Sequence, residues 1–319
     1  MKRIDELDFL RGFALIGIIL INITQMINCL IPEQGTPDYV VRVVLDYGVS
    51  QRFFPIFSFL FGIGFYLFIF RANSNGNNGR KLFIRRLLIL LAIGFIHHLF
   101  QPGEALLPYA ICGFILIPFY KFKPKTNFII AVILLIPSLW IGYVFMIFTM
   151  FLLGLCVGQL QVFESLNRYK KTIRRLQMIA LAAIPISLYL QYEITSTTGM
   201  VDVAGTVGGL AVSLFYVTTL TLLLQHTTVK KWLSPLKNIG RMALTNYLMQ
   251  TLLIICIDSI FNLNNHVHLT TLIMISVGIL ILQMIYSTIW LKRFKMGPIE
   301  LLWRIGTYGK VPHHHKKGY

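Results

Sequence analysis

The stretch LDFLRGFALIGIILINITQ, residues 7–25, decides the fold class. A helix of this length spans about 28 Å at 1.5 Å per residue, close to the ~30 Å hydrocarbon core of a bilayer. Asp8 and Arg11 stand near its start, and Asn22 and Gln25 stand in its second half. The stretch therefore predicts a transmembrane helix that carries polar groups at a depth where they are costly.

The composition extends this pattern to the whole chain. The 319 residues are 56% hydrophobic and 13% charged, and their mean hydropathy is +0.70. Soluble chains carry about 25% charged residues. Because no long polar linker divides the chain, we predict an all-α, multi-pass protein of the bacterial cytoplasmic (inner) membrane, with a single integral membrane domain over residues 1–319.

Apolar segments long enough to cross a membrane, or nearly so, recur along the sequence. The ten segments are residues 9–31, 53–71, 82–100, 105–120, 127–142, 144–161, 174–193, 205–226, 241–261 and 268–291. If the N-terminus is cytoplasmic, every Lys and Arg except Arg42 and Arg52 falls at a cytoplasmic end. Inner loops carry such an excess of positive charge. We therefore expect about ten transmembrane helices with both termini in the cytoplasm, and short interfacial helices at 38–50 and 297–308.

The net charge of +17 would suit nucleic acid if it were gathered in one patch. It is distributed instead over short loops between apolar segments. The expected partners are therefore anionic lipid headgroups, and no binding of nucleic acid is expected. Cys29, Cys112, Cys156 and Cys256 lie in four different apolar segments without C-x-x-C spacing. We expect neither a disulfide framework nor a bound metal.

Polar residues in the first segment form a stripe. Asp8 and Arg11 are three residues apart and can pair on one face of a helix. Arg11 and Asn22 are eleven residues apart, about three full turns, and Gln25 continues the line. Two interpretations stay open: Asp8 and Arg11 anchor the helix at the interface while Asn22 bonds a neighbouring helix, or the stripe lines a path through the protein.

The segment at 82–100 has arginines at one end and histidines at the other. Arg86 and His97 are eleven residues apart, share a stripe and are separated by about 16 Å. His98 points about 100° away, so one histidine is expected to face inward and the other lipid or the interface. Adjacent histidines on a helix do not form the i, i+4 pair of a metal site. A structural hydrogen bond and a general base or proton relay both remain open.

The segment at 241–261 carries five hydrogen-bonding groups. Tyr247, Thr251 and Asp258 share a face at spacings of four and seven, with Asn246 and Gln250 beside it. One interpretation is that these residues hold neighbouring helices together and that Tyr247 belongs to the interfacial aromatic belt. The alternative, which we favour for so many polar groups, is that they line a pocket or pore.

The segment GTVGGL, residues 205–210, is rich in glycine. It lacks the lysine of a P-loop and starts on the predicted outer side of the membrane, so it does not indicate a phosphate-binding loop. Small residues let helix backbones approach each other closely. The segment therefore predicts close helix packing.

Several stretches together resemble the YeiB-like family of bacterial inner-membrane proteins, which has a C-terminal domain of unknown function. They are LDFLRGFALIGIILINI (7–23), FFPIFSFLFGIGF (53–65), AIGFIHHLFQPGEALLPYAICGFIL (92–116), IGRMALTNYLMQTLL (239–253) and WLKRFKMGPIELLWR (290–304). The resemblance is strongest over about residues 1–120 and 200–310. More distantly, the Asp8/Arg11/Gly12 start, Asn22 and IGRMALTNYLMQ are similar to the transmembrane acyltransferase superfamily, which includes heparan-alpha-glucosaminide N-acetyltransferase.

This distant resemblance implies an acyltransferase that takes an acyl group from cytoplasmic acyl-CoA, with acetyl-CoA the first candidate. It would place the acyl group on a sugar or lipid hydroxyl or amine at or across the membrane. The acetyltransferase has a histidine shortly after the asparagine of its first helix, and this sequence has none there. The expected base is therefore His97, which the YeiB-like pattern also has, with Glu104 to orient it.

The remaining site residues are assigned by chemistry. Arginine binds phosphate through paired hydrogen bonds, so the predicted seat of the CoA phosphates is Arg11, Arg85, Arg86 and Arg241. The predicted tunnel lining is Asn22, Gln25, Asn246, Tyr247, Gln250 and Asp258. An alternative function is a small-solute transporter or exporter in which Asp258 or His97 relays protons, and a third is a non-catalytic scaffold. The sequence is compatible with a homodimer.

Overall fold

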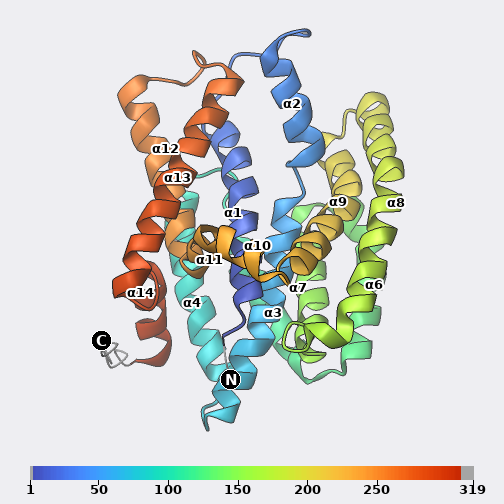
Figure 1. Cartoon of the computed structure of the whole chain (residues 1–319), viewed down its shortest axis with the longest axis vertical. Helices are drawn as coiled ribbons and strands as arrows, with labels where there is room; N and C mark the ends of the chain where they lie inside the picture. Colours follow the sequence, from blue (N-terminus) through green and yellow to red (C-terminus); the bar gives the residue numbers. More distant parts are fainter. Residues whose placement is uncertain (1–2, 310–319) are drawn as a thin grey trace.

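Each predicted apolar segment corresponds to a helix in the computed structural model, which describes residues 3–309 (Figure 1). These helices are α1 (Asp5–Met26), α3 (Phe53–Ser74), α4 (Gly79–His98), α5 (Leu106–Leu116) with the 3-10 turn η1 (Ile117–Lys121), α6 (Pro124–Ile141), α7 (Tyr143–Gln159), α8 (Leu166–Thr198), α9 (Val201–Leu223), α12 (Ala243–Phe261) and α13 (Leu269–Arg293). The other described helices are short: α2 (Pro37–Gly48), α10 (Thr227–Trp232), α11 (Ser234–Arg241) and α14 (Pro298–Tyr308).

The lengths and apolar character of the helices are those of a multi-pass membrane protein. Seven stretches are long and apolar enough to cross a membrane: α1, α2 together with α3, α6, α8, α9, α12 and α13. The apolar helices α5 with η1 and α7 are shorter. The all-α, multi-pass fold is thus as predicted. The start of α1 and the end of α14 lie at the same end of the bundle (Figure 1); the number of crossings and the side of the membrane stay predictions.

Helix α1 lies in the middle of the bundle (Figure 1) and packs against α3, α9, α11, α12 and α13. Leu10, Leu15, Ile19 and Ile23 are fully buried on it. A helix that is apolar on nearly all sides is one that neighbouring helices enclose. This position places Asp8 and Asn22 of the polar stripe inside the protein and not against lipid.

The contact between α1 and α11 depends on two glycines. A Cβ on Gly12 would lie 2.0 Å from the carbonyl oxygen of Leu236, and a Cβ on Gly240 would lie 1.8 Å from that of Asp8. Small residues at helix crossings allow backbones to approach this closely. The short helix α11 therefore fixes the first turns of α1, where Asp8 and Arg11 stand.

Helix α2, predicted as an interfacial helix, has twelve residues, which is too short to cross a membrane without α3, and it lies at the end of the bundle away from the chain termini (Figure 1). Asp38 fixes its first turn: it accepts hydrogen bonds from the Thr270 hydroxyl at 2.5 Å and the Thr270 backbone N–H at 2.9 Å, and His268 lies 2.8 Å away. The bonds from Thr270 lower the pKa of Asp38 to about 2. Its last turn is held by Tyr216, whose hydroxyl donates to the Gly48 carbonyl at 3.1 Å.

Helices α6 and α8 present apolar side chains outward. Ile133, Ile136 and Trp140 on α6 and Ile179 and Ile186 on α8 are each more than 60% exposed. In water such a surface would be an aggregation hazard. In a bilayer it is the surface that faces the lipid chains, so these helices form part of the outer wall of the bundle.

Candidate functional site

A cavity of about 990 Å³ runs along α1 inside the bundle. On α1 its lining extends from Asp8 to Gln25, which are separated by about 26 Å of helix, and Arg3, just before α1, also lines it. The same cavity is lined by Arg304 of α14 near the chain termini and by Asp202 of α9 near the opposite end. It therefore connects the two ends of the bundle, which we call the arginine end and the far end.

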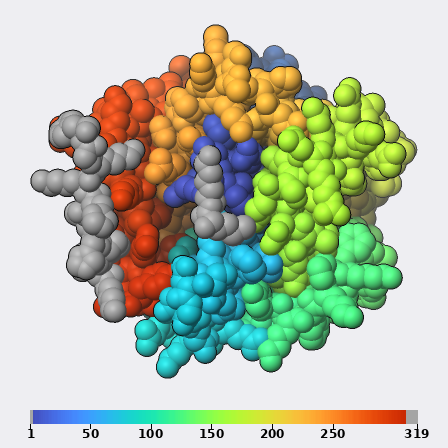
Figure 2. Space-filling view, turned by 60° about the horizontal axis from the view of Figure 1, so that its bottom comes forward, coloured from blue at the N-terminus to red at the C-terminus, as the bar shows by residue number. Residues whose placement is uncertain are grey.

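Six arginines line the arginine end. Figure 2 shows this face of the molecule, with the start of α1 in its middle and α3, α4, α8, α10, α11 and α14 around it. The arginines are Arg3, Arg11, Arg71, Arg86, Arg241 and Arg304, and the carboxylates that line the same end are Asp8 and Glu300. The excess of four positive charges makes this end suitable for an anion with several phosphate oxygens.

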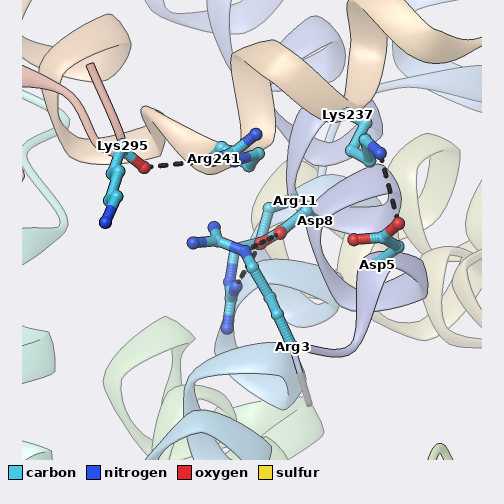
Figure 3. A network of polar contacts seen from close by, with 7 residues as sticks. All are labelled: Arg3, Asp5, Asp8, Arg11, Lys237, Arg241 and Lys295. Atoms are coloured by element: carbon cyan, nitrogen blue, oxygen red, sulfur yellow. Dashed lines mark hydrogen bonds and ion pairs between the residues drawn. The ribbon is translucent and has the colours of Figure 1, made fainter. Parts of the chain in front are cut away.

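Asp8 organises two of these arginines. Its carboxylate accepts hydrogen bonds from Arg3 Nε at 2.5 Å and from Arg11 Nη1 at 2.9 Å, as the sequence spacing of Asp8 and Arg11 predicts. Arg241 is drawn near this pair in Figure 3, and its Nη2 donates to the Lys295 carbonyl oxygen at 3.0 Å. The buried Asp8 carboxylate thus holds the guanidinium groups of Arg3 and Arg11, while Arg241 is held by the backbone after α13.

Arg86 is held by aromatic rings. Its guanidinium carbon lies 3.5 Å from the ring centre of Trp303 and 5.2 Å from that of Phe68. The Trp303 indole N–H donates to the backbone carbonyl of Arg86 at 2.8 Å. Stacking fixes the plane of a guanidinium and leaves its N–H edge available for hydrogen bonds, the geometry that recognises phosphate.

Helix α14 positions this wall of the cavity through Glu300. Its carboxylate accepts hydrogen bonds from the backbone N–H groups of Leu244 at 2.8 Å and Thr245 at 3.1 Å and from the Thr245 hydroxyl at 2.5 Å. These N–H groups belong to the first turn of α12, where a helix lacks internal acceptors and favours negative charge. Glu300 therefore caps α12 from a segment more than fifty residues later in the chain.

We expect Glu300→Ala to lower the free energy of unfolding by about 1–2 kcal/mol, because the first turn of α12 loses a charged cap. Thermal unfolding of the detergent-purified protein measures the effect. Glu33→Ala, an exposed change in the loop before α2, is the matched control and should leave the melting temperature unchanged. Equal melting temperatures for the two variants would contradict the capping role.

Asn22 and Tyr247 line the middle of the cavity. Both side chains are more than nine-tenths buried. The Asn22 amide nitrogen has no hydrogen-bond partner among the described residues. The Tyr247 hydroxyl accepts a 3.4 Å hydrogen bond from the Ala105 N–H. A buried amide without a partner is costly in a protein interior, so Asn22 is a group that a bound molecule could satisfy.

His97 packs against the cavity wall at Tyr247 without lining the cavity itself. The structure buries His97 and exposes His98, and the centres of the His97 and Tyr247 rings are 5.0 Å apart. His97 Nε2 is 2.8 Å from the Thr251 hydroxyl, and Nδ1 is 3.5 Å from Glu104 Oε1. Glu104 also caps α5 by accepting from Leu106 N and Leu107 N. The structure thus brings the predicted base and its predicted carboxylate together, without placing either in the lining.

Other predicted lining residues serve helix packing. Asn246 donates to Ser287 Oγ at 3.0 Å and to the Ile239 carbonyl at 3.1 Å. Gln250 donates to Gln283 Oε1 at 3.0 Å. Asp258 accepts from the backbone N–H groups of the turn after α12, at 3.1 and 3.2 Å. These contacts are those of the helix-holding interpretation. Gln25 lines the far end of the cavity, and Arg85 is exposed outside it.

Sequence reasoning missed the parts of the site that later segments contribute. Trp303 and Glu300 come from GPIELLWR, which the sequence indicates only as an amphipathic helix. The phenylalanines of α3 that line the cavity, among them Phe57 and Phe61, resemble lipid-facing residues in the sequence.

Among residues 3–309, no three His, Cys, Asp or Glu side chains form a group that could hold a metal ion.

Comparison with known proteins finds relatives that align with nearly the whole length of the chain. Residues 157–310 match the family described as "Protein of unknown function (DUF418)". The chain is 43% identical to the "Uncharacterized 39.9 kDa protein in amylase 3'region" of Bacillus acidopullulyticus, over 97% of this chain and 95% of that protein. It is 29% identical to YxaH of Bacillus subtilis, over 96% and 94%, and 25% identical to YeiB of Escherichia coli, over 95% and 96%. No solved structure matches the chain.

Proposed function

The chain belongs to the YeiB-like family, and from that premise we propose that it is a transmembrane acyltransferase of the bacterial cytoplasmic membrane. The donor is an acyl-CoA bound from the cytoplasm, and the acceptor is a hydroxyl or amine compound that enters the opposite end of the cavity. The observation that carries the proposal is one cavity that begins among six arginines and continues past Asn22 and Tyr247 to the far end of the bundle.

The arginine end supports a donor with several phosphates. Asp8 is engaged by Arg3 and Arg11, and Glu300 is engaged by the first turn of α12, so neither carboxylate offsets the remaining positive charge fully. Arg86, whose plane is fixed by Trp303, presents its N–H edge. A strongly charged CoA head would be held here while its thin thioester arm extends along α1.

The middle of the cavity supports the transfer step. An acyl thioester that reaches this depth would meet the free amide N–H of Asn22, a donor suited to the carbonyl oxygen as negative charge develops on it. In the step, the acceptor oxygen or nitrogen gives its proton to a base and forms a bond to the acyl carbon, and the carbon–sulfur bond breaks. The base then returns that proton to the leaving sulfur, so that CoA departs as the thiol.

His97 is the base in this proposal, and Glu104 stabilises its protonated form. Because His97 packs against Tyr247, which lines the cavity, and does not line the cavity itself, the proposal requires the Tyr247 ring to turn aside when the acceptor binds. Tyr247 would then act as a cover over the base and not as the proton acceptor itself. If His97 is the base and Tyr247 the cover, changes at His97 and at Tyr247 should affect the reaction rate differently.

Donor binding is the first test. A ligand that binds the folded protein at 100 times its Kd adds about 2.7 kcal/mol of stability, so acetyl-CoA, longer acyl-CoAs and free CoA should raise the melting temperature of the purified protein. We expect Arg86→Ala to weaken this binding by about 10–100-fold, because charge-assisted bonds to phosphate are lost. Arg85→Ala, a neighbouring arginine that is exposed and outside the cavity, should leave it unchanged.

The outcomes of this titration are distinct. No stabilisation by any CoA species would overturn the acyltransferase proposal. Equal weakening in Arg85→Ala and Arg86→Ala would mean that CoA binds to the basic surface and not in the cavity.

Transport of an amphipathic anion is the second candidate, and one observation favours it. The cavity connects both ends of the bundle, while His97 and Glu104 do not line it. A transporter would move a labelled anion across proteoliposomes, and it would release no CoA from acetyl-CoA. Uptake without thiol release would therefore select this function over the first.

A further inference from the structure

The far end of the cavity differs in chemistry from the arginine end. Among the polar residues that line it are Gln25, Ser50, Gln51, Asp202 and Thr206. Asp202 is the charged side chain among them, and Gln51 Nε2 donates to its Oδ1 at 3.2 Å. Amide, hydroxyl and carboxylate groups together offer donors and acceptors for hydroxyl groups, and the carboxylate disfavours an anion.

Gln51 is held in a backbone conformation that most side chains avoid. Its φ is +60°, in the left-handed region, which is uncommon for residues other than glycine. Such strain persists only where the surroundings over-determine it, and it is often found at functional sites. Here the strained backbone belongs to the residue whose amide meets Asp202 at the cavity lining.

Two features hold Gln51 in place. The next residue, Arg52, is fully buried. Its guanidinium donates hydrogen bonds to Gln191 Oε1 and to the carbonyl oxygens of Ser50 and Gly205. On α9, a Cβ on Gly209 would lie 2.6 Å from the Gln51 carbonyl oxygen. The close packing predicted for residues 205–210 is thus confirmed, and it seats the Gln51 turn against α9. Arg52 itself does not line the cavity, so the groups presented there are the amide and the carboxylate.

We propose that Gln51 and Asp202 form the recognition site for the acceptor and select a neutral or cationic hydroxyl compound over an anionic one. This inference rests on the proposed function, in which the acceptor enters at the far end of the cavity. It adds the class of acceptor and two specificity-determining residues. The charge difference between the two ends of the cavity also separates the two substrates, since the phosphate-rich donor is disfavoured at Asp202.

Three probes that share one sugar ring and differ in charge test the proposal: D-glucosamine, D-glucose and D-glucuronate. Binding to the purified full-length protein is measured by calorimetric titration. We expect glucosamine to bind about tenfold more tightly than glucuronate, with glucose between them, and we expect Asp202→Asn to reduce that ratio to about twofold. Equal affinity for glucosamine and glucuronate in the unaltered protein, or no binding of any of the three, would overturn the proposal.

Gln51→Gly separates recognition from stability. Glycine adopts a positive φ without strain, so the melting temperature should stay the same or rise, while affinity for all three probes falls by about tenfold. Glu33→Gln, on an exposed loop outside the cavity, should change none of the affinities. Unchanged affinity in Gln51→Gly would overturn the role of Gln51.

Acetyl-CoA binding to the same variants keeps the two proposals apart. Gln51 and Asp202 lie at the opposite end of the cavity from the arginines. Both variants should therefore bind acetyl-CoA with unchanged affinity. Sugar selectivity without any CoA binding would overturn the acyltransferase proposal and support the recognition site. CoA binding without sugar selectivity would overturn the recognition site and support the acyltransferase proposal.

Discussion

Replacing Gly240 by alanine should unfold or displace the start of α1, with a loss of about 3 kcal/mol or more in the free energy of unfolding. The added Cβ would lie 1.8 Å from the Asp8 carbonyl oxygen and 2.7 Å from the Gly12 backbone nitrogen. Both are backbone atoms of a central helix, so no side-chain rotation can relieve the overlap. Thermal unfolding in detergent and the fraction of protein that elutes as a single species measure the result.

Gly278→Ala is the matched control. Gly278 stands in the middle of α13, and an added Cβ there would meet nothing within 4 Å. Alanine favours the helix over glycine by about 0.5–1 kcal/mol, so this variant should be as stable as the unaltered protein or slightly more stable. Similar melting temperatures for the two variants would show that α1 and α11 do not pack as described.

The second large effect is expected at His97. His97→Ala should slow the release of CoA thiol from acetyl-CoA by about 10²–10⁴-fold, the usual contribution of a general base, while acetyl-CoA binding stays unchanged. The binding is retained because His97 lies away from the arginines that line the cavity. A thiol reagent follows the release in proteoliposomes, and a thermal-shift titration follows the binding.

Two further variants identify the base. His98→Ala, on the exposed face of the same helix, should retain the rate. Tyr247→Phe removes the hydroxyl and keeps the ring, so it should also retain the rate if Tyr247 is only the cover. A rate lost in Tyr247→Phe and kept in His97→Ala would assign proton transfer to the tyrosine and reject His97.

Short sequence spacings predicted local features of the site well. The Asp8–Arg11 pair and the stripe that carries Arg11 and Asn22 to the cavity both follow from the helix repeat. Helical spacing also predicted that His97 and His98 face different ways, and burial then showed that His97 is the inward one. These features depend on residues within one helix, where geometry is fixed by hydrogen bonds between near neighbours.

The same spacing could not tell a lining residue from a packing residue. One helix carries three buried polar residues, Asn246, Tyr247 and Gln250. Of these three, only Tyr247 lines the cavity, while the amide groups of the other two donate hydrogen bonds to side chains of α13. A polar group inside a membrane protein needs a partner. Whether that partner is another helix or a bound molecule depends on which helix lies opposite.

By itself, the sequence determined that this is an all-α, multi-pass membrane protein, because apolar runs of membrane length and a lack of charge leave helices as the structure that satisfies every backbone group. It also determined the order of the polar groups along each helix. Only the tertiary structure decided that Arg86 stacks on Trp303, that Glu300 caps α12 and that Gln51 meets Asp202. These contacts join residues far apart in the chain, and packing at glycines such as Gly12 and Gly240 brings their helices together.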